Sequence, residues 1–196
     1  MGLILDHLAV ACTDLAEGTA WVESQLGVKM QPGGQHLRYG THNTLLGLGD
    51  IYLEVIAPDP EVAPSDGRRW FGLDDFQGPP RLANWICQTT HFDPIAGPPM
   101  ALARGDLRWQ LTVPEDGTLP FGGAYPTLIK WADGTRHPVQ QLDDSGCRLT
   151  QLTIHHPTAD RIAAMIDLPD PCVRFVNGAP SFHAVFEGAA GVVQLT

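Results

Sequence analysis

The sequence is short of positive charge and has no long apolar run. Its 196 residues contain 12 Lys and Arg against 22 Asp and Glu, a formal net charge of −10 at pH 7. Nucleic acids and anionic membranes bind clustered positive charge, so neither is expected as a partner. No stretch approaches the roughly 20 apolar residues that span a bilayer, and the first residues show no secretory pattern. We therefore expect no contact with a membrane.

Closely spaced cysteines are also missing. The four cysteines form no C-x-x-C or similar pair; they are Cys12, Cys87, Cys147 and Cys172. Structural zinc sites and disulfide frameworks usually show close or regular spacing. We expect reduced thiols and a cytoplasmic protein.

The chain opens with alternating apolar residues that predict a β-strand with one histidine in its middle. Side chains alternate across a strand, so His7 faces away from Leu8 and Val10. The residues that follow decide which of these two faces is covered.

A helix is predicted directly after this strand. Asp14 begins a D-x-x-E capping box, which predicts a helix over 15–26 that ends at Gly27. Its apolar positions would pack on Leu8 and Val10. The histidine would then lie on the open, helix-free face of the sheet.

The same order of elements recurs near the C-terminus. Residues 148–166 repeat a strand, a turn and a helix, with Gln151 in the position of His7. A pair of strands follows in both copies, and this aligns Gln194 with Glu54. Alternation places Glu54 on the face of His7, and Gln194 on the face of Gln151.

A third, degraded copy lies between these two. Residues 81–134 contain three strand-like stretches, with a segment interrupted by Gly and Pro where the other copies have their helix. Trp85 or Ile86 stands near the position of His7. The preceding residues, 58–80, are dense in Pro, Gly and Asp and predict a loop that could overhang a site.

These patterns predict one α+β domain over residues 1–196. It consists of a βαβββ unit (1–58), the degraded unit (81–134) and a second βαβββ unit (146–196), which form a curved mixed or antiparallel sheet. Helices at about 15–26 and 158–167 would lie on the convex face of this sheet.

Four stretches between Leu5 and Pro157 carry a resemblance to a known group of proteins: LDHLAVACTDL, GTHNTLLGLGDIYLEVIAPDP, YPTLIKWADGTRHP and GCRLTQLTIHHP. They resemble motifs of the vicinal oxygen chelate superfamily, which includes glyoxalases, extradiol dioxygenases and bleomycin-resistance proteins, and they are most similar to its glyoxalase-like branch. The resemblance implies a divalent metal, such as Zn, Fe, Mn or Ni, on the concave face. His7 and Glu54 match the metal-ligand pattern of that superfamily.

The match is incomplete because Gln151 and Gln194 stand where a second His and Glu would be expected. A catalytic zinc or iron usually has three protein ligands, and an amide oxygen is a weaker donor than imidazole or carboxylate. Two interpretations stay open: a metal site of His7, Glu54 and Gln151, or a metal-free pocket in which His7 and Glu54 hydrogen-bond each other. Further donors could come from neighbouring histidines, His91, His155 or His183.

Two functions from different classes remain open. One is a metal-dependent lyase, isomerase or dioxygenase-like enzyme, and the other is a protein that sequesters a small apolar or aromatic molecule. In either case we predict a concave pocket whose lining includes His7, Glu54, Gln151, Gln194 and Trp85. Any catalysis is expected to depend on Glu54 as the proton-transfer group. The substrate, and whether the chain acts alone or as a homodimer, stay open.

Arg104 and Arg108 lie near the start of a strand-like stretch. Two arginines in such a place can bind a carboxylate, but solvated charge is the commoner role. We interpret them as solvated, with carboxylate binding as the alternative.

Overall fold

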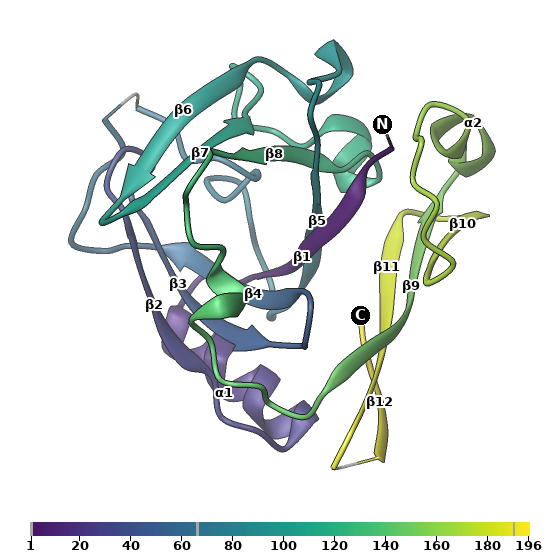
Figure 1. Cartoon of the computed structure of the whole chain (residues 1–196), viewed down its shortest axis with the longest axis horizontal. Coiled ribbons are helices and arrows are strands. Elements are labelled where there is room, and N and C mark those ends of the chain that lie inside the picture. Colours follow the sequence, from purple (N-terminus) through teal and green to yellow (C-terminus); the bar gives the residue numbers. More distant parts are fainter. Residues whose placement is uncertain (1, 66, 190) are drawn as a thin grey trace.

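The computed structural model describes residues 2–65, 67–189 and 191–196 (Figure 1). It contains a strongly curved eight-stranded sheet, which nearly closes into a barrel, and a separate four-stranded sheet beside it. The strands of the large sheet are β1 (Ile4–Ala11), β2 (Gln31–His36), β3 (Thr41–Gly47), β4 (Tyr52–Pro58), β5 (Arg81–Gln88), β6 (Pro99–Arg104), β7 (Leu107–Thr112) and β8 (Thr127–Trp131). Those of the small sheet are β9 (Arg148–His156), β10 (Val173–Asn177), β11 (Ser181–Gly188) and β12 (Gly191–Leu195).

The large sheet is built from two units with the same strand order. In the unit 1–58, β1 pairs in parallel with β4, and β3 and β2 follow outward. In the unit 81–134, β5 pairs in parallel with β8, and β7 and β6 follow outward. The two units meet where β1 and β5 run antiparallel. The unit expected to be a degraded copy therefore supplies half of the curved sheet.

The unit 146–196 keeps the order of elements along the chain but pairs its strands differently. β9 pairs in parallel with β10 and antiparallel with β11, and β12 pairs with β11. Because β12 does not lie beside β9 as β4 lies beside β1, the alignment of Gln194 with Glu54 is wrong. Alternation identifies a strand and its two faces, but it does not identify the strand's partner.

Helix α1 (Leu15–Leu26) forms where the capping box predicts it. The Asp14 side chain accepts a hydrogen bond from the Glu17 N–H, and Gly27 ends the helix in the left-handed conformation. Val22 and Leu26 pack in the apolar core on the outer face of the large sheet. The predicted α+β fold, with this helix on the convex side, is confirmed.

The second helix is shorter than predicted. Helix α2 covers Ala159–Ala163, and the chain then continues in tighter turns in which Met165 N–H bonds the Ile162 carbonyl. Met165 and Ile166 still pack against the core. The apolar residues that predicted a longer helix are therefore buried from turns instead of from a helix.

The small sheet covers part of the outer face of the large one. Leu152 and Ile154 from β9 and Phe186 from β11 share one buried cluster with Trp85 from β5. The inner face of the large sheet carries a second apolar cluster, which Trp70 and the residues beside it close from the loop after β4. Among the described residues, no helix has the length and apolar content needed to cross a membrane.

Candidate functional site

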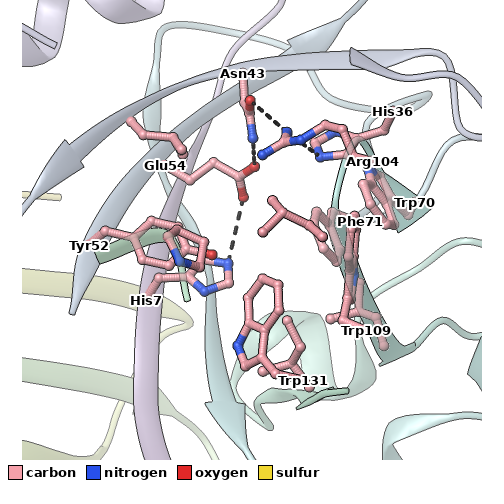
Figure 2. A pocket seen from close by; sticks show the side chains of 15 residues that line it. His7, His36, Asn43, Tyr52, Glu54, Trp70, Phe71, Arg104, Trp109 and Trp131 are labelled. Atoms are coloured by element: carbon pink, nitrogen blue, oxygen red, sulfur yellow. Dashed lines mark hydrogen bonds and ion pairs between the residues drawn. The ribbon is translucent and has the colours of Figure 1, made fainter. Parts of the chain in front are cut away.

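A cavity lies on the concave face of the large sheet (Figure 2). Its volume is about 40 Å³, enough for a few water molecules or a compact ligand. The apolar and aromatic part of its lining consists of Leu45, Trp70, Phe71, Leu107, Trp109, Leu111, Ile129, Trp131 and Pro138. The polar part consists of His7, His36, Asn43, Tyr52, Glu54 and Arg104.

A bulge in β1 brings the buried Asp6 against His7, which lines the cavity. The register of β1 against β5 shifts between Leu5 and His7, and such a shift re-aims the side chains beside it. The buried Asp6 consequently lies with its Oδ1 atom 2.5 Å from His7 Nδ1. An ionised carboxylate only accepts hydrogen bonds, so Nδ1 carries the proton and Nε2 is the second nitrogen of the ring.

Asp6 is held from three sides. Its second oxygen accepts hydrogen bonds from Trp131 Nε1 and His137 Nε2, both at 3.0 Å. Burial raises the pKa of Asp6, but the hydrogen bonds from His137 and His7 outweigh it and hold the pKa below its ordinary value. Asp6 is therefore a carboxylate at neutral pH and offsets the charge of a protonated His7 ring. The sequence interpretation missed Asp6 because strict alternation placed it on the opposite face.

The two oxygens of Glu54 have different surroundings. Oε1 accepts a hydrogen bond from Asn43 Nδ2 at 2.5 Å, whereas Oε2 lies 3.8 Å from His7 Nε2. This separation is too long for a hydrogen bond, so the direct His7–Glu54 bond considered from the sequence is not formed. Both residues are 5% exposed. The two atoms can therefore contact one small ligand from neighbouring positions.

Tyr52 restrains the His7 ring. The two rings stack with their centroids 4.2 Å apart and an angle of 14° between their planes. Burial, together with the charges of Asp6 and Glu54, raises the pKa of Tyr52 well above its ordinary value. The phenol stays neutral and packs as a flat surface under the imidazole.

Arg104 reaches from β6 to the unit 1–58, between Asn43 and His36 (Figure 2). Its Nη1 atom donates to His36 Nε2 at 3.2 Å and to Asn43 Oδ1 at 3.3 Å. Since a guanidinium only donates, the proton of the neutral His36 ring is on Nδ1, which donates to Thr41 Oγ1 at 3.2 Å. Burial and the charge of Arg104 lower the pKa of His36 to about 3.

His7 and Glu54 lie on the same face of the sheet, as predicted. The two glutamines predicted beside them lie elsewhere. Gln151 in β9 donates to Thr153 Oγ1 at 2.9 Å. Gln194 in β12 is exposed and donates to His183 Nδ1 at 2.7 Å. Neither lines this cavity, because both belong to the small sheet.

Trp85 also lies away from the cavity. It pairs with Leu8 across β1 and β5, so it faces the outer core, where its Nε1 donates to the Gly123 carbonyl at 3.1 Å. Ile86 pairs with His7 and takes the inward position. Of the two residues named from the sequence, the inward one is therefore the isoleucine.

The donors present do not fit the predicted Zn, Fe, Mn or Ni site. His7 and Glu54 provide two ligands, whereas the middle unit contributes the aliphatic Ile86 and Ile129 to the same face. In the described part of the chain, no three His, Cys, Asp or Glu side chains gather around a common point. A catalytic zinc site has three protein ligands, and the guanidinium of Arg104 disfavours another cation nearby. The further donors considered from the sequence do not line the cavity either: Gln151, His91, His155 and His183.

Two paired units with the strand order of the βαβββ motif, the second of them without its α-helix, surround a concave polar site and match the fold of the vicinal oxygen chelate superfamily. Within it, residues 5–168 match the glyoxalase-like domain, and the chain belongs to this family. A hypothetical protein from Staphylococcus aureus has the same fold, with a TM-score of 0.66, 13% identity, and coverage of 95% of this chain and 92% of that chain.

Methylmalonyl-CoA epimerase from Mycobacterium tuberculosis is a more remote structural neighbour. It shows 19% identity and a TM-score of 0.44, with coverage of 67% of this chain and 89% of that chain. No curated protein matches the chain.

Proposed function

We propose that the protein is an isomerase-type enzyme that moves a proton on a small carbonyl compound. The observation that carries the proposal is the 3.8 Å gap between His7 Nε2 and Glu54 Oε2, two buried groups that face each other without a direct hydrogen bond. An acid and a base held apart in this way can act on adjacent atoms of one substrate. The proposal uses no metal, because the donor set provides two ligands.

The proposed reaction is enolisation. Glu54 Oε2 removes a proton from the carbon beside the carbonyl, and the electrons of that C–H bond form the C=C bond. The carbonyl oxygen takes the Nε2 proton of a protonated His7, whose charge Asp6 offsets across a 2.5 Å hydrogen bond. Glu54 then gives the proton to a carbon at a new position while the oxygen returns its proton to His7 Nε2, which completes an isomerisation.

The surroundings prepare both groups for this step. Asn43 holds Glu54 Oε1, so Oε2 is the oxygen left for the substrate. Tyr52 and Asp6 fix the ring of His7 by stacking and by hydrogen bonding. A substrate seated between the apolar walls displaces water, which strengthens the electrostatic interactions inside the cavity.

A second candidate is a binding protein without chemistry. Its support is the largely aromatic lining, which includes Phe71, Trp109 and Trp131 and would suit a compact apolar molecule. Such a protein would use Glu54 as a hydrogen-bond acceptor only. The two candidates predict different results for one experiment.

That experiment follows deuterium exchange at the carbon beside the carbonyl by proton NMR in D₂O. Pyruvate and glycolaldehyde serve as probes, and exchange above the buffer rate is expected with the natural protein. Glu54→Gln should reduce the enzyme-dependent rate by about 100-fold or more, the usual scale for a lost general base. Glu61→Gln is the matched control, since Glu61 is exposed outside the cavity.

Equal rates in the natural protein and Glu54→Gln would contradict the proposal. Probe binding without any exchange would favour the binding protein.

A further inference from the structure

Arg104 is the one cation in the cavity lining that bridges the two units of the large sheet. It ends β6, and its side chain passes over Gly34 in β2, where a Cβ atom would lie 3.0 Å from Arg104 Cδ. A glycine at this position therefore leaves room for the arginine stem. The arrangement fixes the guanidinium between the outermost strands of the sheet.

The guanidinium has no acidic partner within the described residues. No Asp or Glu oxygen of that part of the chain lies within 4.0 Å of its nitrogens. Its Nη1 atom instead donates to two neutral acceptors, His36 Nε2 and Asn43 Oδ1. A half-buried positive charge without a counter-ion is unfavourable unless an anion joins it.

The donors that remain have the geometry that a carboxylate needs. In the described structure the Nε and Nη2 atoms of Arg104 donate to no protein group. A planar guanidinium edge can bind both oxygens of a carboxylate in two parallel hydrogen bonds. Because His36 and Asn43 hold Nη1, the orientation of this edge is set before a ligand arrives.

We infer that Arg104 binds the carboxylate of the substrate. The substrate is a short-chain organic acid in which a carbonyl group is bonded to the carboxylate carbon. The inference rests on the proposed function in taking this cavity as the substrate site. The cavity volume of about 40 Å³ favours a compact acid. Trp109 and Ile129 line the space for its carbon chain, and Glu54 and His7 lie at the reacting carbon and oxygen.

The inference is tested with two probes of the same shape and different charge, isobutyrate and isobutyramide. Binding is followed by the NMR shifts of the tryptophan indole N–H groups. The natural protein should bind the acid about tenfold more tightly than the amide, the difference between a charge-assisted and a neutral hydrogen-bonded pair. Arg104→Met should lose this preference.

Two further variants make the result specific. Arg108→Met removes an exposed arginine whose Nη1 atom bonds backbone carbonyls, and it should keep the full preference. Arg104→Lys keeps the charge without the planar edge and should show an intermediate preference; it also covers the case in which Arg104→Met does not fold.

Two outcomes would overturn the inference: an unchanged preference in Arg104→Met, or equal binding of the two probes by the natural protein. Equal binding of the two probes by the natural protein, with Glu54-dependent exchange intact, would refute the inference alone. A carboxylate preference that depends on Arg104, without Glu54-dependent exchange, would refute the proposed function alone.

Discussion

His36 gives the most quantitative prediction because its ring must stay neutral to accept from Arg104. Burial and the Arg104 charge lower the pKa of His36 from 6.5 to about 3 in the folded protein. The unfolded chain therefore binds a proton that the folded chain does not. The contribution of His36 to stability is present above the unfolded pKa, and it is lost as the pH falls from 6.5 towards about 3.

The magnitude follows from this difference. Each pH unit below the unfolded pKa costs about 1.36 kcal/mol, so at about pH 5 the cost is about 2 kcal/mol. His36 is half-buried, and partial solvation reduces the expected effect to about 1–2 kcal/mol. This is a large share of the stability of an ordinary domain.

The measurement is urea unfolding of the natural protein and of His36→Gln at about pH 7 and about pH 5. Glutamine can still accept from Arg104 but does not titrate. The natural protein should lose about 1–2 kcal/mol more than the variant over this interval. The other seven of the eight histidines are present in both proteins, so their contributions cancel in the comparison. Equal losses, or a larger loss in the variant, would refute the assignment of a neutral, accepting His36.

Three further changes test the rest of the site and the core. Asp6→Asn keeps the shape of the side chain but removes the charge behind His7. Proton exchange should therefore slow by about ten- to a hundredfold, and the affinity for isobutyrate should stay unchanged. Weaker isobutyrate binding at an unchanged exchange rate would contradict the role of Asp6 in positioning His7. Dialysis against EDTA should leave the thermal unfolding midpoint and the proton-exchange rate unchanged. A loss of exchange that Zn²⁺ or Mn²⁺ restores would show that the cavity binds a metal with more ligands than His7 and Glu54. Gly18→Ala should destabilise the protein by about 1–3 kcal/mol in urea unfolding. The reason is that a Cβ atom at this position would clash with Cys12 Sγ and would lie 2.8 Å from Val55 Cγ1. An unchanged urea midpoint would contradict this packing.

Local patterns in the sequence predicted the parts of the site that depend on one strand or one helix at a time. Alternation placed His7 and Glu54 on one face, the capping box at Asp14 predicted where α1 begins, and the apolar positions of α1 placed it on the other face. Both signals are local, because side-chain direction follows from backbone periodicity alone.

The features that the sequence did not predict depend on contacts between distant strands. The bulge that brings Asp6 beside His7 interrupts the period of two and leaves no mark in the pattern of apolar residues. The pairing of β12 with β11, which separates Gln194 from Glu54, depends on the choice of partner strand. Arg104 and Arg108 looked alike in the sequence, and only the closure of β6 towards β2 places the first of them in a cavity.

The construction of the large sheet from two units has a consequence for how this protein could diversify. The groups proposed to transfer protons, His7 and Glu54, lie in the unit 1–58 together with the Asp6 carboxylate behind His7, whereas Arg104, Trp109 and Ile129 lie in the unit 81–134. Reactivity and ligand choice are thus encoded in separate stretches of the chain. A library of variants confined to β6 and β7 would explore new ligands while His7, Glu54 and the groups that hold Asp6 stay unchanged, so one inherited chemistry could serve many compounds.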